Sequence, residues 1–466
     1  MSVPDWIQDA IFYHIFPDRF YNGDPENDPP NVQLWGSSPT SWGFQGGDLK
    51  GILQKFDYLL DLGINAIYMN PIFQATSNHR YNTMDYYNID PKLGTLDDFH
   101  ALVEYAHRKD VRIILDGVFN HCGRSFFAFS DILENQDYSP YREWFHLKHF
   151  PVNAYTVGEA TDYIGWWGMK SLPKFNTNNL NVRKYLMDVA VYWIEQGADG
   201  WRLDVPNEIN DDSFWTEFRQ VVKSANPEAY IFGEIWSADL RWVGENHFDG
   251  LINYPVMDAL VGLLVSNSLD VAHFAEKVEG LLSFYPAENA YAMYVPVDSH
   301  DTERILTKLG NNINRTRLAY LFQFAYPGAP SIYYGDEIGL TGGKDPGCRG
   351  AFPWDENNWN KELRNYVKTL VELRKRHRAL RRGEYIRLGK ITDPECYAFV
   401  RRTTDDQVLV ILNASVRDQI ITVNTDETGW EDGRRVNNLI TPGEQYTITN
   451  QTIEITLPAW GGYWLA

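Results

Sequence analysis

The chain has 466 residues, 44% of them hydrophobic, which is enough for a large buried core and for two or three domains. Its formal net charge of −20 disfavours binding to nucleic acid or to an anionic membrane, and no apolar run approaches the roughly 18 residues of a transmembrane helix. Its three cysteines favour reduced thiols over a disulfide framework, and its N-terminus lacks the pattern of a secretion signal, so we expect a cytoplasmic protein.

Short apolar runs alternate with helical patterns over about the first 340 residues. Amphipathic patterns such as 47–63 and 95–107 predict helices between several of these runs. Strands alternating with helices in this way predict a (β/α)8 barrel. The eight predicted strands are 10–16, 64–73, 111–120, 199–205, 229–236, 250–256, 292–300 and 329–339.

The rhythm breaks twice, and the breaks define the predicted domains. The aromatic, irregular stretch 121–178 reads as a small domain inserted after the third strand. Alternating strand patterns in 382–466 indicate a C-terminal antiparallel β-sandwich. We therefore expect an α/β fold, a TIM barrel built from 1–120 and 179–381 that carries these two additions.

The fourth predicted strand contains Arg202 and Asp204, which project from the same side of a buried strand. Buried charges are costly unless they are paired, bound to a ligand or needed for chemistry. Asp116, Glu234 and Asp301 lie at the ends of three other strands, where barrel enzymes place their active sites. One such acid would more often be a salt-bridge or capping residue, but four at one rim indicate an active site.

Four short segments resemble the signature regions of the α-amylase superfamily of glycoside hydrolases, in the family's order. They are DGVFNH (116–121), GWRLDVPNE (200–208), GEIW (233–236) and SHD (299–301). SLPKFN (171–176) resembles a fifth region typical of the neopullulanase, cyclomaltodextrinase and maltogenic amylase group, which includes debranching activities. The resemblance covers essentially the whole chain.

The resemblance implies that Asp204 is the nucleophile, Glu234 the general acid/base and Asp301 the stabiliser of the transition state. Retaining glycosidases place two carboxyl groups about 5–5.5 Å apart, so that one attacks the anomeric carbon while the other protonates the leaving oxygen. Arg202 is expected to favour the ionised form of Asp204, whereas Glu234 needs surroundings that keep its pKa high.

Further residues would contact the sugar by the same resemblance. Tyr81 would stack under the sugar that loses its bond, and Trp236 would be a platform on the leaving-group side. His121 and His300 would bind hydroxyls, while Asp116 would position Arg202. Each of these residues, taken alone, fits a structural role about as well. The expected substrate-binding set is Tyr81, Asp116, His121, Trp166, Trp167, Arg202, Glu208, Trp236, His300 and Arg349.

Residues 19–31 gather oxygen donors at short spacing, which suits Ca²⁺ better than Zn²⁺ or Mg²⁺, although composition alone would favour an ordinary polar turn. The segment resembles a calcium loop of the neopullulanase group. The resemblance implies a structural Ca²⁺ site, and no organic cofactor is expected. Its ligands would be Asn22, Asp24, Asn27, Asp28, Gly46 and Asp48.

Two departures from the group stand out. The chain begins almost at the first barrel strand, so an N-terminal β-domain of the kind that builds the group's dimer is not expected, and a homo-oligomer would have to form in another way. Pro206 follows Val205 where the group would have alanine. Proline fixes φ and removes a donor, which could reshape the mouth near Glu208.

Three functions fit these residues. The first is retaining hydrolysis of α-1,4 and some α-1,6 bonds in maltooligosaccharides, cyclodextrins, pullulan or branched oligosaccharides, with transglycosylation. The second is a dedicated α-glucanotransferase that uses the same covalent glucosyl-enzyme intermediate. The third, a non-catalytic binding protein, is disfavoured because Asp204, Glu234 and Asp301 are all present. The expected partner is an oligosaccharide, with no nucleic acid and no membrane.

Overall fold

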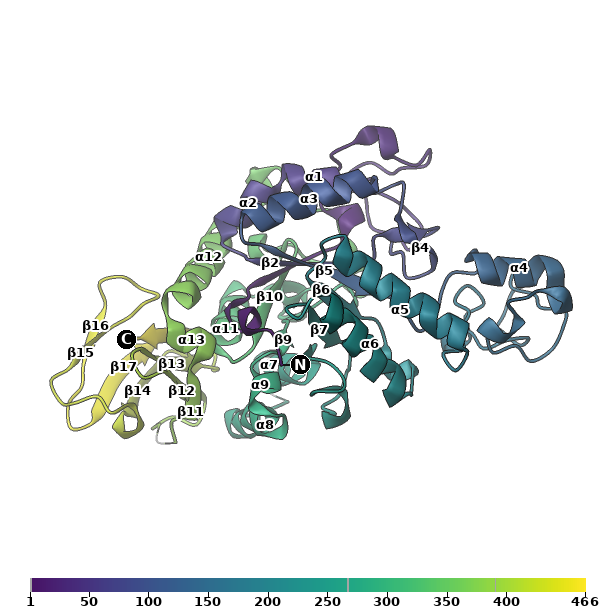
Figure 1. Ribbon diagram of the computed structural model, residues 1–466. Helices are drawn as coiled ribbons and strands as arrows, with labels where there is room; N and C mark the ends of the chain where they lie inside the picture. The colour runs from purple at the N-terminus through teal and green to yellow at the C-terminus, as the bar shows by residue number, and fades with distance from the viewer. Residues whose placement is uncertain (1, 266–267, 390) are drawn as a thin grey trace.

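The computed structural model describes residues 2–265, 268–389 and 391–466. Its centre is a parallel sheet in the order β8-β7-β6-β5-β2-β1-β10-β9 (Figure 1). The end strands meet: a parallel bridge joins Ile252 to Tyr294, and the Asn253 N–H donates to the Tyr294 carbonyl at 2.8 Å. The predicted (β/α)8 barrel is thereby confirmed. Its strands are β1 (Phe12–Ile15), β2 (Ala66–Met69), β5 (Arg112–Gly117), β6 (Gly200–Leu203), β7 (Tyr230–Gly233), β8 (Gly250–Leu251), β9 (Tyr294–Val295) and β10 (Ala329–Tyr333).

Helices cover the outside of the barrel. In α3 a capping box between Thr95 and Asp98 satisfies backbone N–H groups of the first turn. The connection from β7 to β8 instead holds a single 3-10 turn, η8 (Leu240–Trp242). The larger helices are α1 (Leu49–Gln54), α2 (Phe56–Leu62), α3 (Leu96–Arg108), α5 (Leu180–Glu195), α6 (Asp212–Ala225), α7 (Tyr254–Val265), α8 (Val271–Phe284), α11 (Ile313–Ala325) and α12 (Lys361–Arg376).

The predicted strand 250–256 is correct only in its first part. The range 250–256 contains β8, but α7 begins at Tyr254. Its apolar residues fit a buried strand and a buried helix equally well, because α7 is apolar around most of its surface. The barrel itself is filled by aromatic rings, since Phe232 stacks on both Tyr230 and Tyr294.

The segment 121–178 lies between β5 and α5 and projects beyond the end of α5 (Figure 1). It contains α4 (Phe127–Asn135) and several 3-10 turns. An isolated bridge between His121 and Lys174 ties its two ends together, and another joins Gly165 to Pro173 in its later part. Between β2 and α3 in the chain, the hairpin of β3 (Phe73–Ala75) and β4 (Thr83–Ile89) carries Tyr81 in its turn.

The C-terminal part consists of antiparallel sheets around a core of its own. The predicted strands of this region are present as β12, β13, β14 and β17. A short helix, α13 (Arg378–Arg382), connects this part to α12. The strands are β11 (Glu384–Arg387), β12 (Cys396–Arg402), β13 (Gln407–Asn413), β14 (Gln419–Asn424), β15 (Arg435–Asn437), β16 (Gln445–Thr447), β17 (Thr452–Leu457) and β18 (Gly462–Leu465).

Within the described ranges, every helix is too short or too polar to cross a membrane. The three cysteines are buried and unpaired.

Candidate active site

Arg202 is the junction of the candidate site. Its side chain is fully buried on β6, and its Nη1 lies 2.9 Å from Oδ1 of Asp116 and 3.0 Å from Oδ1 of Asp204. Its Nη2 lies 3.0 Å from Oε2 of Glu234. The strand register explains the cluster, because Asp116 of β5 pairs directly with Arg202 across the parallel ladder. One guanidinium thus compensates three buried carboxylates, which removes much of the cost of burying each of them.

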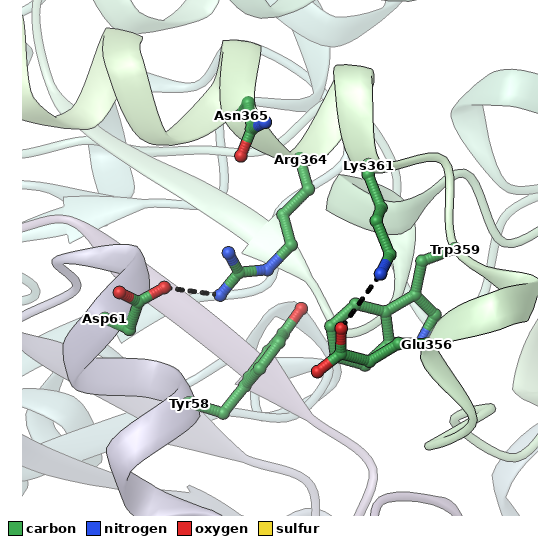
Figure 2. A pocket seen from close by; sticks show the side chains of 7 residues that line it. All are labelled: Tyr58, Asp61, Glu356, Trp359, Lys361, Arg364 and Asn365. Atoms are coloured by element: carbon green, nitrogen blue, oxygen red, sulfur yellow. Dashed lines mark hydrogen bonds and ion pairs between the residues drawn. The ribbon is translucent and has the colours of Figure 1, made fainter.

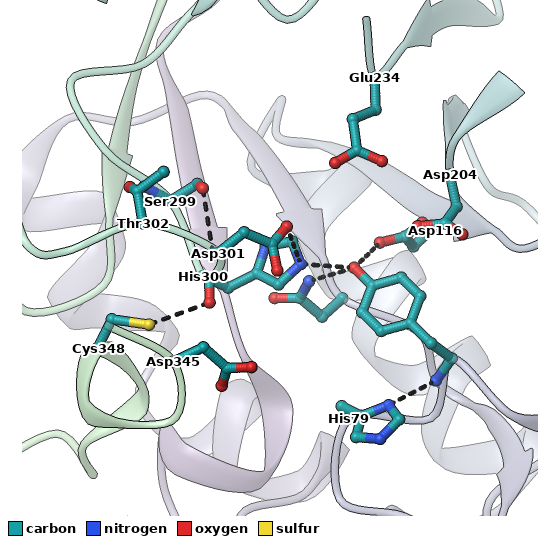
Figure 3. A network of polar contacts seen from close by, with 12 residues as sticks. His79, Asp116, Asp204, Glu234, Ser299, His300, Asp301, Thr302, Asp345 and Cys348 are labelled. Carbon is teal, nitrogen blue, oxygen red and sulfur yellow. Dashed lines mark hydrogen bonds and ion pairs between the residues drawn. The ribbon is translucent and has the colours of Figure 1, made fainter. Parts of the chain in front are cut away.

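The main chain continues the barrel ladder past the strand ends. The Asp204 N–H donates to the Gly117 carbonyl at 3.0 Å, and the Glu234 N–H donates to the Leu203 carbonyl at 3.0 Å. These bonds fix the two acids side by side at the C-terminal rim. Figure 3 shows Glu234 descending toward the space between Asp301 and Asp204.

Asp301 completes the rim from the loop after β9. Its Oδ1 lies 3.1 Å from Nη2 of Arg349, and its Oδ2 lies 3.0 Å from Nε2 of His300. The Asp301 side chain is 31% exposed, against 9% for Asp204 and 5% for Glu234. Asp301 is therefore the acid most open to an entering ligand.

Tyr81 connects the two halves of the site. Its hydroxyl donates to Oδ2 of Asp116 at 2.8 Å and lies 2.7 Å from Nε2 of His300. Its ring is parallel to that of His300, with the centroids 5.6 Å apart. Tyr68, on β2, also donates to Oδ2 of Asp116, at 2.6 Å. These contacts hold Asp116 toward Arg202 and leave the Tyr81 ring along the wall of the site.

Burial and the neighbouring charges set the pKa values of Glu234 and Asp204. Burial raises the pKa of Glu234 to about 7, with Arg202 opposing the rise and Asp301 adding to it. Burial also raises the pKa of Asp204, although Arg202 opposes it. Burial therefore outweighs the attraction of Arg202, which the sequence led us to expect to keep Asp204 ionised. The Glu234 charge raises the pKa of Asp204 further, so the protonation of one acid affects that of the other.

The histidines add no positive charge. Burial lowers the pKa of His121 to about 3 and that of His300 well below its usual value. Neutral imidazoles can donate and accept hydrogen bonds with sugar hydroxyls. Buried ring nitrogens, Nε2 of His121 and Nδ1 of His300, have no partner within the described residues.

Aromatic stacks form two further walls. The ring of Trp166 stacks on His121 at 5.1 Å and on Trp167 at 4.6 Å, and Trp167 is 76% exposed. The second stack is formed by Trp236 and Tyr254, whose ring centroids are 3.9 Å apart. Half of Trp236 remains exposed. These rings are surfaces on which pyranose faces can stack.

Tyr68, Tyr254 and Lys174 are residues at the site that the sequence analysis did not predict. Tyr254 lies close enough for the Glu234 charge to raise its pKa further, beyond the effect of burial, and its position fell in a range read as strand. Lys174 lies in the irregular segment, where its Nζ donates to the Glu208 carbonyl at 2.7 Å and approaches Oε2 of that residue at 3.6 Å. The match of SLPKFN to a fifth family region was the one signal for Lys174.

A separate hollow of about 350 Å³ lies between α2 and α12 (Figure 2). Arg364 pairs there with Asp61, and Lys361 with Glu356. None of the predicted site residues lines this hollow, and its charged side chains neutralise one another.

The predicted calcium ligands fall into one region beside the start of α1. Nδ2 of Asn22 donates to both carboxylate oxygens of Asp28, and Nδ2 of Asn27 faces Oδ2 of Asp48 at 3.4 Å. A Cβ at Gly46, where φ is +83°, would lie 2.2 Å from Oδ1 of Asp28, so only glycine fits this close approach.

Oδ1 of Asn22 and Oδ1 of Asn27 are buried and have no partner among the residues that the structure describes, as is expected of atoms that bind a hard cation. The Asp24 carboxylate pairs with Lys50 instead of joining them. No group of three His, Cys, Asp or Glu side chains suited to a metal occurs in the described ranges. The open amide oxygens of Asn22 and Asn27, beside the carboxylates of Asp28 and Asp48, are of the kind that suits a hard cation such as Ca²⁺.

Comparison with known proteins gives a consistent result. The α-amylase catalytic domain family matches residues 14–376. A cyclomaltodextrinase of Geobacillus thermopakistaniensis (strain MAS1) is 42% identical over 99% of this chain and 77% of its own length. Among solved structures, a cyclic α-maltosyl-(1→6)-maltose hydrolase of Arthrobacter globiformis is 40% identical, covers 100% of both chains and has a TM-score of 0.91. A debranching enzyme of Nostoc punctiforme is 38% identical, covers 100% of this chain and 99% of its own, and has a TM-score of 0.90.

Proposed function

The chain belongs to the α-amylase family of glycoside hydrolases, and on that premise we propose that it is a retaining α-glucan hydrolase acting at Asp204, Glu234 and Asp301. The observation that carries the proposal is the contact of Arg202 with Asp204 and Glu234 at 3.0 Å each. This arrangement holds a nucleophile and an acid side by side on one rim.

The reaction follows from the protonation of the pair. Glu234, with a pKa of about 7, gives its proton to the glycosidic oxygen while an Asp204 oxygen attacks the anomeric carbon. Glu234, now ionised, then removes a proton from water, which displaces Asp204 and restores the starting state. Two inversions give a product with the α configuration of the substrate.

Asp301 is assigned to the transition state. Its exposed carboxylate faces the space between the other two acids (Figure 3). Hydrogen bonds from sugar hydroxyls to Asp301 and the neutral His300 strengthen as the ring flattens toward the oxocarbenium ion. Arg349 keeps Asp301 oriented through their 3.1 Å contact.

We assign the substrates as short α-1,4-linked glucans, cyclodextrins, pullulan and branched oligosaccharides, with some cleavage of α-1,6 bonds. Names of relatives support this range, because they include a cyclomaltodextrinase and a hydrolase of cyclic α-maltosyl-(1→6)-maltose. The walls of His121 with Trp166, and of Trp236 with Tyr254, offer stacking surfaces to several sugars.

The second candidate is a dedicated α-glucanotransferase. The half-exposed Trp236 favours it, because an acceptor sugar can stack there and displace Asp204 in place of water. One experiment separates the two: maltoheptaose, β-cyclodextrin, pullulan and a branched maltooligosaccharide are each digested with and without a labelled acceptor. Reducing sugar in proportion to bonds cleaved supports hydrolysis, whereas products that all carry the label support the transferase.

The matched variants for this assay are Asp204→Asn and Asp188→Asn. Asp188 lies on the exposed side of α5 and pairs with Lys184. Loss of cleavage in the first variant alone supports the assignment of Asp204. Unchanged cleavage by Asp204→Asn would contradict the assignment of Asp204 as the nucleophile.

A structural Ca²⁺ and a cytoplasmic location complete the proposal. Asn22, Asn27, Asp28, Gly46 and Asp48 would hold the ion, which would tie the loop after β1 to the start of α1 and take no part in bond cleavage. The three buried, unpaired thiols favour a reducing compartment.

A further inference from the structure

Val205 has a backbone conformation that a β-branched residue rarely adopts. It lies between Asp204 and Pro206, with φ +36° and ψ 50° in the left-handed region. A residue before proline is normally extended, so both its own side chain and Pro206 oppose this conformation. Such strain persists where the surroundings hold it in place, and it is often found at functional sites.

The neighbours of Val205 are fixed on both sides. The Asp204 N–H is bonded to the Gly117 carbonyl, and the indole N–H of Trp215 donates to the Pro206 carbonyl at 3.2 Å. Trp215 is 1% exposed on α6, so its ring is held firmly by the core. The peptide between these two anchors has little freedom to relax.

The strained residue directs a donor at the general acid. The Val205 N–H donates to Oε2 of Glu234 at 3.0 Å, and Nη2 of Arg202 lies 3.0 Å from the same oxygen. Within the described part of the chain, no protein donor contacts Oε1. Oε2 thus accepts one hydrogen bond and lies against the Arg202 cation, and both contacts disfavour a proton on it, so a proton on this carboxyl belongs on the other oxygen.

We propose that the strained Val205–Pro206 segment is a positioning element for the general acid, which confines the catalytic proton to Oε1 of Glu234. The inference rests on the proposed function. In the first step the Oε1–H bond breaks and its proton joins the glycosidic oxygen. That oxygen keeps the electron pair of the bond to C1, and C1 gains a bond to Asp204. Without the Val205 donor, the proton is shared between two oxygens, only one of which faces the substrate.

The test compares two leaving groups in Trp215→Phe, which removes the indole donor to the Pro206 carbonyl, so that Val205 can relax and turn its N–H away. Maltotriose needs protonation of its leaving oxygen, whereas the fluoride of α-maltosyl fluoride needs little. We expect kcat/KM for maltotriose to fall about tenfold or more, while that for the fluoride stays within about twofold. Trp6→Phe, which removes an indole donor to the Glu228 carbonyl before β7, is the matched control and should leave both rates unchanged.

A check on folding and a double-mutant cycle keep the test decisive. Circular dichroism and the melting temperature of Trp215→Phe establish that the variant is folded before the two rates are compared. In a Glu234→Gln background, Trp215→Phe should cause no further loss on either substrate. Equal loss on both substrates, no loss on either, or an additive loss in Glu234→Gln would overturn the inference. A wild-type protein that cleaves no α-glucan would instead overturn the proposed function.

Discussion

Nη2 of Arg202 lies 3.0 Å from Oε2 of Glu234. The cation that faces the nucleophile therefore also faces the acid. Its attraction lowers the pKa of both carboxyls, while burial raises both, and burial prevails for each. The consequence is a pair of acids whose protonation governs activity near neutral pH.

The first prediction is a narrow, bell-shaped pH dependence of kcat/KM. The active form carries one proton on the pair, so activity falls above the Glu234 pKa of about 7. It also falls on the acidic side, where the second proton occupies Asp204, and this limb should lie above the usual aspartate value because burial raises the Asp204 pKa. Initial rates on maltotriose and on α-maltosyl fluoride check this. An alkaline limb that is equally steep with the fluoride would argue against Glu234 as the acid.

The second prediction concerns stability. The folded protein holds the Glu234 proton up to a pH of about 7, whereas the unfolded chain releases it near the ordinary glutamate pKa of 4.5. The stability associated with protonated Glu234 is thus present below pH 4.5 and is lost as pH rises through 7. That difference corresponds to about 3 kcal/mol. Because glutamine cannot ionise, Glu234→Gln should gain more stability over wild type at about pH 8 than at about pH 5.

Thermal melting at the two pH values measures this difference. Glu104→Gln, on the exposed side of α3, is the matched control and should show no such dependence. A Glu234→Gln gain of equal size at the acidic and the alkaline pH would contradict the linkage.

The third prediction concerns the shape of the cation. Arg202→Lys keeps the charge, but one ammonium cannot occupy the positions of both Nη1 and Nη2. We expect kcat/KM to fall about 100-fold or more and the melting temperature to drop, because buried carboxylates lose their partner. Arg183→Lys is the control, since Arg183 also binds two acids, Asp211 and Glu217, but at the outer surface. Equal effects of the two variants would contradict the central place of Arg202.

The fourth prediction concerns calcium. An ion bound only to the folded state stabilises it by RT ln(1 + [Ca²⁺]/Kd). Chelation should lower the melting temperature while leaving the initial rate at low temperature nearly unchanged. Asp28→Ala should make the melting temperature insensitive to added Ca²⁺, and Asp24→Ala is an informative control, because its carboxylate pairs with Lys50. Immediate loss of turnover on chelation, without a change in melting temperature, would contradict a structural role.

The sequence was sufficient to predict the barrel and the positions of its acids. The eight strands were visible as apolar runs, and a residue at a strand end must lie at the rim whatever its rotamer. Local signals also placed α3, whose capping Thr95 and apolar stripe are both visible in the sequence.

What the sequence could not predict depends on contacts between distant segments. The sharing of Arg202 among three carboxylates requires the register of β5, β6 and β7. The burial that raises the pKa of Asp204 also depends on how these strands come together. The stack of Trp236 on Tyr254 was hidden because an apolar run at 250–256 fits strand and helix alike. The backbone of Val205 is set by its anchors, and no residue preference indicates a left-handed valine before proline.

The central claim is that Asp204 attacks the anomeric carbon while Glu234 protonates the leaving oxygen, and the stereochemistry of fresh product tests it most directly. Proton NMR is recorded on an α-linked substrate during the first turnovers, before the anomers equilibrate. Two inversions at the same carbon predict that the α-anomer appears first and the β-anomer grows only by mutarotation. If the β-anomer appears first, a single displacement by water has occurred, and the assignment of Asp204 as nucleophile is wrong.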